Sequence, residues 1–207
     1  MSGPVDTIHY VPAKRLPNYN IVATVVTPRF KRFGADLFVI TGQDDNFFEW
    51  SSCWLWVITA DLDWRPTDQL RLSARYLRRQ YVRLSNWTSV SSHQIPRLKV
   101  EYQLSRPIFL RVVAQYDTNI QDSLRDDSRT NFPILIRDPA TNRFTRASRL
   151  LSNNLQMNWL FSYQPTPGTV VFLGYGSSLT EPDRFAFRDL ARVNDGFFVK
   201  LTYLIRW

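Results

Sequence analysis

Apolar and polar residues alternate along the segment FFVKLTYLIRW. Phe197, Val199, Leu201, Tyr203, Ile205 and Trp207 share one side, against Lys200, Thr202 and Arg206 on the other. A period of two is that of a β-strand, in which successive side chains point to opposite faces of the sheet. No run in the chain approaches the roughly 18 consecutive apolar residues that a membrane helix needs. The pattern predicts strands with one apolar and one polar face, and it excludes a helical membrane span.

Further segments show the same two faces. They lie at residues 54–64, 70–76, 98–104, 108–116 and 155–163. Less regular apolar segments at 20–27, 35–42 and 169–177 bring the expected total to about nine strands. Since no segment has the periodicity of a good helix, the sequence predicts an all-β protein.

Short and long connections alternate between these strands. Short turns marked by proline lie at 65–68, 105–107 and 164–168, whereas longer polar segments lie at 84–92, 118–152 and 178–196. In an antiparallel meander, this alternation gathers the turns at one end and the loops at the other, as in outer-membrane barrels. We therefore predict an antiparallel up-and-down transmembrane β-barrel, or its terminal strands, with about 8–10 strands.

If the apolar stripes face lipid, the other side of each strand lines the interior. The candidate lumen residues are Arg71, Arg75, Lys99, Glu101, Gln103, Arg111, Gln115, Asn154, Gln156, Asn158, Lys200 and Arg206. The candidates for aromatic girdles at the two membrane interfaces are Trp54, Trp64, Tyr163 and Phe197. Such a lumen suits either an internal ion-pair network that holds a plugged barrel rigid or a conduit or binding surface, and both alternatives stay open.

Composition and motifs limit the chemistry. The formal net charge of +8 admits nucleic acid or anionic membrane as a partner, but the basic and aromatic residues at 75–87 favour a strand that leaves the membrane, so we expect no nucleic acid. The single cysteine, Cys53, excludes an internal disulfide, and His9 and His93 have no zinc spacing. The residues Ser91-Ser92-His93 lack the strained Gly-x-Ser-x-Gly turn. We expect no catalytic residues, no cofactor and no metal.

The end of the chain also resembles known sequences. Leu201, Tyr203, Ile205 and Trp207 resemble the insertion signal that the barrel assembly machinery recognises in bacterial outer-membrane proteins. The run LLSNNLQMNWLFSYQPTPGTVVFLGYGSSL, followed by FFVKLTYLIRW, resembles the end of a family of uncharacterised bacterial proteins. In that family, a signal peptide and an amino-terminal domain related to carbohydrate-binding family nine precede a carboxyl-terminal barrel of unknown function. The resemblance extends over residues 48–207 and implies no catalytic residues.

The resemblance implies a place in the bacterial outer membrane. The expected partners are outer-membrane lipid and lipopolysaccharide, the barrel assembly machinery, and carbohydrate through a domain outside this chain. Residues 1–19 are expected to form a polar lead-in without an export signal, and residues 20–207 to form barrel strands with short periplasmic turns and long external loops. The chain would anchor that domain, or pass material for it, as a fragment of a longer exported protein. A soluble lipocalin-like or sandwich binding module and a barrel-embedded hydrolase are the alternatives.

Overall fold

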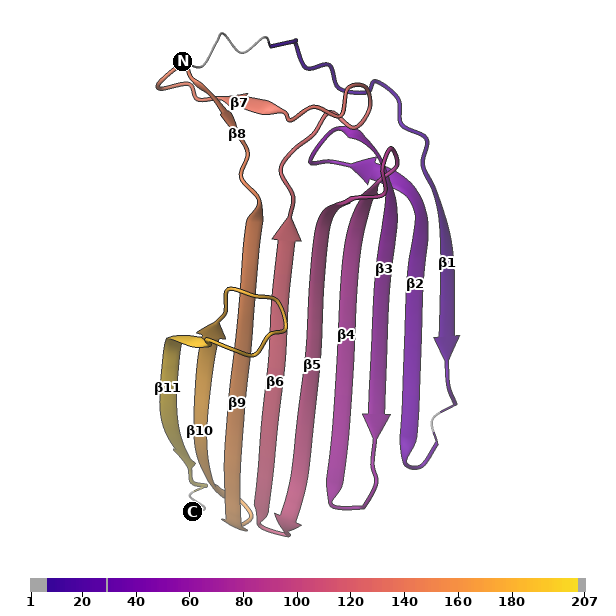
Figure 1. The fold of residues 1–207 in the computed structure, drawn as a ribbon. Coiled ribbons are helices and arrows are strands. Elements are labelled where there is room, and N and C mark those ends of the chain that lie inside the picture. Colours follow the sequence, from indigo (N-terminus) through magenta and orange to yellow (C-terminus); the bar gives the residue numbers. More distant parts are fainter. Residues whose placement is uncertain (1–6, 29, 205–207) are drawn as a thin grey trace.

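Nine strands form one antiparallel sheet in which each strand pairs with its neighbours in chain order (Figure 1). The computed structural model describes residues 7–28 and 30–204. The strands are β1 (Tyr19–Val26), β2 (Phe33–Asn46), β3 (Ser51–Trp64), β4 (Leu70–Arg83), β5 (Ser89–Ser105), β6 (Ile108–Gln121), β9 (Leu150–Thr166), β10 (Thr169–Thr180) and β11 (Ala191–Thr202). Between β6 and β9, the short strands β7 (Leu135–Arg137) and β8 (Phe144–Arg146) pair as a separate hairpin. The predicted all-β, up-and-down antiparallel fold is confirmed.

Most strands are longer than their apolar stripes. For example, β5 begins at Ser89 and β11 at Ala191, because the polar residues ahead of each stripe still pair their backbones with the neighbouring strand. The turns at 65–69, 106–107 and 167–168 share one end of the sheet with the connection 27–32. The other end, called the loop end below, has short connections at 47–50 and 84–88 and long ones at 122–149 and 181–190. No helix in the described residues is long and apolar enough to cross a membrane.

The register joins the separate stripes into one continuous apolar face. One row of paired residues runs Trp64, Leu72, Val100, Val112, Trp159, Tyr175 and Phe197. The row nearer the loop end is Leu62, Ala74, Leu98, Ala114 and Met157, and the row nearer the turns is Leu70, Tyr102, Leu110, Phe161, Leu173 and Val199. These residues define the apolar face.

The opposite side of the same strands forms the polar face. One row contains Asp61, Arg75, Arg97, Gln115, Gln156 and Ser178, and the next contains Asp63, Ser73, Lys99, Val113, Asn158, Gly176 and Gly196. A third row contains Arg71, Glu101, Arg111, Leu160, Gly174 and Phe198. Because side chains alternate at every residue, this sorting follows directly from the register.

The sheet is a single layer over most of its area. The accessible surface is 14517 Å² for a 24.4 kDa chain, whereas a compact monomeric protein of this mass exposes roughly 10,000 Å². Among the described residues, the buried hydrophobic side chains are those of Cys53, Leu55, Val82, Val90 and Tyr116. The apolar stripes therefore do not form the core of a sandwich within the described residues.

The sheet ends in two open edges, β1 and β11, whose described residues are exposed. Since nine antiparallel strands follow one another in order, β1 and β11 run in the same direction. On the inner side of β1, Asn20 pairs with Gly42 of β2. A Cβ on Gly42 would lie 2.1 Å from the carbonyl oxygen of Tyr19, so only glycine lets β1 come this close.

We predict that Gly42→Ala destabilises the pairing of β1 with β2 by about 1–3 kcal/mol, because the new methyl group collides with the backbone of β1. Gly34→Ala is the matched control, since Gly34 lies on the same face of the same strand and a Cβ there has no neighbour within 4 Å. Hydrogen exchange at the amides of β1 measures the effect. Equal protection in the two variants would contradict the prediction.

Candidate functional site

Ion pairs cover one half of the polar face. The Nε of Arg71 donates to both carboxylate oxygens of Asp63, at 3.2 and 3.0 Å. Arg75 Nε donates to Asp61 at 2.6 Å, and Lys99 Nζ lies 3.1 Å from Glu101 Oε2. Because each of these cations has a carboxylate partner, this half of the face is nearly neutral.

Arg97 and Arg111 differ from these cations. Within residues 7–28 and 30–204, neither guanidinium has an acidic partner within salt-bridge distance or a side-chain hydrogen bond. Both residues are exposed on the polar face. Arg79 on β4 and Lys200 on β11 also lie on this face without an acidic partner among the described residues. Arg97 and Arg111, by contrast, lie on the adjacent strands β5 and β6.

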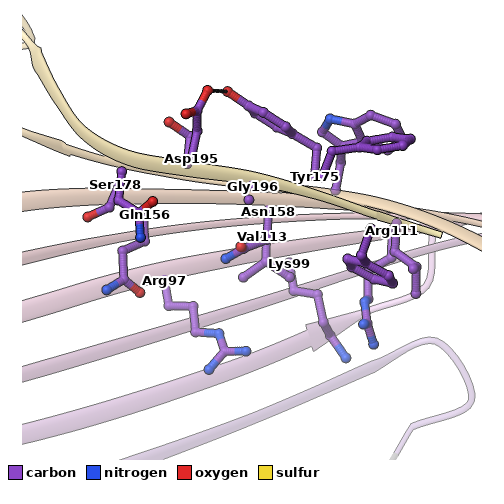
Figure 2. Close-up of a pocket in the computed structure, with 17 residues that line it drawn as sticks. Arg97, Lys99, Arg111, Val113, Gln156, Asn158, Tyr175, Ser178, Asp195 and Gly196 are labelled. Carbon is purple, nitrogen blue, oxygen red and sulfur yellow. Dashed lines mark hydrogen bonds between the residues drawn. The ribbon is translucent and has the colours of Figure 1, made fainter. Parts of the chain in front are cut away.

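The two arginines line a hollow of about 750 Å³, called the arginine hollow below. The polar side chains of Arg97, Lys99, Arg111, Gln156, Asn158, Ser178 and Asn194 line it from the polar face, and Tyr175, Ser177 and Asp195 also border it. Figure 2 shows Arg97, Lys99 and Arg111 projecting from one side of the sheet, whereas the hydrogen-bonded pair of Tyr175 and Asp195 lies on the other. The hollow therefore belongs to the polar face.

Glycines on β10 and β11 make room for the hollow. A Cβ on Gly174 would lie 2.2 Å from the ring of Phe198, and one on Gly176 would lie 2.5 Å from Asn158 Oδ1. The phenyl ring and the amide thus lie directly over these glycines. A Cβ on Gly196 would have no neighbour within 4 Å, so open space lies above that residue. Glycine inside a strand is typical of places where another group approaches the backbone.

The structure places the predicted lumen residues on the polar face. Arg71, Arg75, Lys99, Glu101, Gln103, Arg111, Gln115, Asn154, Gln156, Asn158 and Lys200 all lie there, whereas Arg206 lies outside the described residues. Arg97 is not among the predicted lumen residues because the expected strand began one residue later, although the spacing from Lys99 places Arg97 on the same face. Asn194 is not among them because β11 begins before the apolar stripe.

The predicted girdle residues all lie on the apolar face. Trp54 is near the loop end, where its Nε1 donates to Thr41 Oγ1 at 2.9 Å and its ring lies 6.3 Å from that of Trp87. Trp64 is at the opposite end of β3, and Tyr163 pairs with Ile108 beside a turn. Phe197 shares the row of Trp64 rather than that of Trp54. In the predicted insertion signal, Leu201 and Tyr203 are exposed, whereas Ile205 and Trp207 lie outside the described residues.

A buried ion pair fixes the loops over the loop end of the polar face. Arg83 is fully buried, and its guanidinium donates to Glu49 Oε1 at 2.5 Å and to Asp122 Oδ2 at 2.8 Å. The same guanidinium donates to the backbone carbonyl of Ser123 at 3.1 Å. Glu49 Oε1 also accepts from the backbone N–H of Arg125 at 2.9 Å. One pair therefore joins the connections 47–50 and 122–149 to the end of β4.

The connections 47–50 and 122–149, held together by Arg83 and Glu49, are called the cap below. The lead-in at 7–18 crosses this cap. Tyr10 Oη donates to the backbone carbonyl of Glu49 at 2.5 Å, and the backbone N–H of Ala13 donates to the carbonyl of Trp50 at 3.3 Å. Arg129 Nη2 donates to the carbonyl of His9 at 3.1 Å. Residues far apart in sequence thus close over the same end of the sheet.

Two other groups bear on catalysis and metal binding. His93 Nε2 lies 3.0 Å from Asp117 Oδ1 on the polar face. Among the described residues, no serine hydroxyl is hydrogen-bonded to this ring, and no cluster of three or more histidine, cysteine, aspartate or glutamate side chains is placed to hold a metal ion. The His93–Asp117 pair therefore does not form the nucleophile and base arrangement of a serine hydrolase.

The fold and this face define the class of the chain as an up-and-down antiparallel β-sheet protein with one apolar and one ion-paired face. In comparisons with known proteins, no family, curated protein or solved structure matches the chain.

We predict that Glu49→Gln lowers the free energy of unfolding by about 3 kcal/mol, because it removes a charge partner from the buried guanidinium of Arg83 while keeping the side-chain shape. Urea titration of the refolded protein measures the loss. Asp189→Asn is the control, since Asp189 is exposed and its positive φ suits asparagine, so its effect stays within about 0.5 kcal/mol. Equal stability of the two variants would mean that the pair does not hold the cap.

We also predict acid sensitivity of the cap. Burial raises the pKa of the Asp122 carboxyl, but hydrogen bonds from Arg83 and the Ser123 backbone outweigh it, so the pKa lies below its ordinary value. The stability that this carboxylate contributes is fully present above its unfolded pKa of about 3.9 and is lost as the pH falls through the lower folded pKa. Unfolding midpoints between about pH 6 and pH 3 should therefore fall more for the wild type than for Asp122→Asn. Parallel pH profiles would refute this.

Proposed function

We propose that this chain is the membrane-spanning sheet of a bacterial outer-membrane β-barrel. In this proposal, the apolar face contacts lipid and the polar face lines a lumen. The barrel anchors, or passes material for, a carbohydrate-binding-like domain located elsewhere in a longer exported protein. The observation on which the proposal depends is the pairing of an uncovered apolar face with an ion-paired face across one layer of strands.

The uncovered apolar face favours lipid over water as its neighbour. Leu98 is 48% exposed and Val112 43%, although both lie in the middle of the face. Continuous exposed apolar patches beyond a few hundred Å² are rare on soluble monomers and mark surfaces that contact a partner or a membrane. A soluble sandwich or lipocalin-like module would need a cover over this face, and in the described residues the cover is limited to the loop end, where Phe185 and Phe187 pack on the buried ring of Tyr116.

The dimensions of the face fit a bilayer. Strands rise about 3.3 Å per residue, so the ten-residue step from Trp54 to Trp64 climbs roughly 25 Å at a tilt of about 40°. This is the height of the apolar band of outer-membrane barrels. Both ends of this stretch bear a tryptophan on the apolar face, as interfacial girdles require.

On β4, β5, β6 and β9 the apolar stripe ends at one row before the loop end, whereas on β3 it continues past this row to Trp54. Toward the loop end, Arg78, Gln94, Thr118 and Asn153 pair across four neighbouring strands. The side chains of this row are polar, and Arg78 hydrogen-bonds to the Gln80 side chain. Polar groups in hydrocarbon are costly without partners, so on β4 and β5 this row suits the headgroup region. On β6 and β9, Thr118 and Asn153 are buried and hydrogen-bond to each other, and Asn153 also donates to the carbonyls of Glu181 and Pro182.

The anchoring role depends on the family resemblance of residues 48–207 rather than on the geometry. The hydrolase alternative has weaker support, because the hydrogen bond of His93 to Asp117 leaves the histidine without a hydrogen-bonded nucleophile in the described residues.

We predict that Leu98→Arg destabilises the protein refolded into lipid vesicles by about 2–4 kcal/mol, whereas Leu104→Arg costs about 0–1 kcal/mol. The two leucines share one face of β5 and are similarly exposed, at 48% and 51%, but Leu104 lies near the turn. Arginine is costly only at the depth of the bilayer centre. Urea titration in vesicles measures the difference.

The soluble alternative predicts a different result for the same two substitutions. On a soluble domain, both leucines face water, so both substitutions would have similar effects within about 0.5 kcal/mol. A chain that stays monomeric and folded without detergent, with equal effects of the two substitutions, would overturn the membrane proposal.

A further inference from the structure

We propose that the arginine hollow binds a negatively charged saccharide, that is, a sugar that bears a carboxylate or a phosphate. This inference rests on the proposed function, because it assigns a ligand class to the face that lines the proposed lumen. Three features of the hollow support it: arginines without acidic partners and side-chain amides without hydrogen bonds among the described residues, and open space above Gly196.

The charges favour an anion. Arg97 and Arg111 lack acidic partners within the described residues, whereas Arg71 and Arg75 on the same face have them. A guanidinium presents a planar fork of donors that matches carboxylate and phosphate oxygens. Two such forks on adjacent strands that line one hollow attract anions from solution.

The amides favour a ligand with hydroxyl groups. Gln156, Asn158 and Asn194 line the hollow, and their side chains make no hydrogen bond within the described part of the chain. Each amide has both a donor and an acceptor. A bare inorganic anion uses donors only, whereas a sugar hydroxyl donates and accepts at once.

The shape favours a ligand of saccharide size. The hollow of about 750 Å³ lies within the range of organic-ligand sites, which is roughly 300–1,000 Å³. The Phe198 ring lies across Gly174 and is 52% exposed, so it offers an apolar surface on an otherwise polar face. The C–H face of a pyranose fits such a surface. The open space above Gly196 leaves room beside it.

The test uses the chain refolded in detergent micelles, with folding verified by heat-modifiable gel mobility. Isothermal titration compares trigalacturonate, glucose 6-phosphate, maltotriose and inorganic phosphate. We expect at least one charged sugar to bind at least 10-fold more tightly than both maltotriose and inorganic phosphate. The tighter of the two charged sugars identifies carboxylate or phosphate as the group that the hollow prefers.

Variants locate the binding. Arg97→Gln combined with Arg111→Gln should weaken binding of the charged sugar at least 10-fold. Gly196→Phe should do the same by filling the hollow, whereas Gly34→Phe should have no effect. Neither glycine has a neighbour within 4 Å of a Cβ, and both lie on the polar face, but Gly34 is outside the hollow. Neither phenylalanine therefore introduces a steric clash at its Cβ, and the two variants differ in whether the new side chain lies in the hollow.

Several outcomes would overturn the inference. Equal affinity for maltotriose would show that charge is not recognised, and equal affinity for inorganic phosphate would show an anion site without sugar recognition. Unchanged binding in Gly196→Phe would place the ligand elsewhere. A chain that folds in micelles but binds no charged sugar refutes this inference alone, whereas a chain that folds as a soluble monomer without detergent refutes the proposed function.

Discussion

The alternation of side chains across a single layer of strands is the constraint on which this structure depends. From β3 to β9, each strand of the sheet presents one apolar and one polar face, and the register keeps both faces continuous across these strands. A sandwich satisfies this constraint by stacking a second sheet on the apolar side. Here the polar side contains the ion pairs of Asp61 and Asp63 with Arg75 and Arg71. Because cross-strand ion pairs of this kind stabilise a face that is not packed against apolar groups, the apolar side is the one that needs a partner outside the sheet.

The number of strands restricts how the two open edges can be satisfied. Since β1 and β11 run in the same direction, direct pairing between them requires one parallel ladder, whereas every other ladder in the sheet is antiparallel. An odd number of additional strands would instead allow complete antiparallel closure, as in bacterial barrels with even strand numbers. In hydrocarbon, unpaired backbone groups on either edge are costly, so one of these two solutions is required if the sheet spans a membrane. A second copy in the same orientation presents edges that run in that same direction, and it therefore does not remove the need for a parallel pair.

The strands and the assignment of side chains to faces were predictable from the sequence, because a period of two appears within each segment and needs no tertiary information. The predicted position of Lys99 on the polar face follows from this period alone. The cap at the loop end was not predictable, because Arg83 and Glu49 are far apart in sequence and neither lies in a recognisable motif. The arginine hollow was missed for a different reason. Its space comes from Gly174, Gly176 and Gly196, and the absence of a side chain has meaning only after the register shows what lies opposite.

The cap and the hollow divide the polar face between two kinds of interaction. At the loop end, Arg83 has carboxylate and carbonyl partners from several connections, so its charge is neutralised by the protein itself. Arg97 and Arg111 lie farther along the sheet, where the small residues of β10 and β11 leave their guanidiniums open. If the face served rigidity alone, these arginines would be paired as Arg71 is, because an unpaired charge gives no cross-strand stabilisation. The uneven distribution of partners thus separates a structural end, which the loops close, from a region whose charges are available to a ligand.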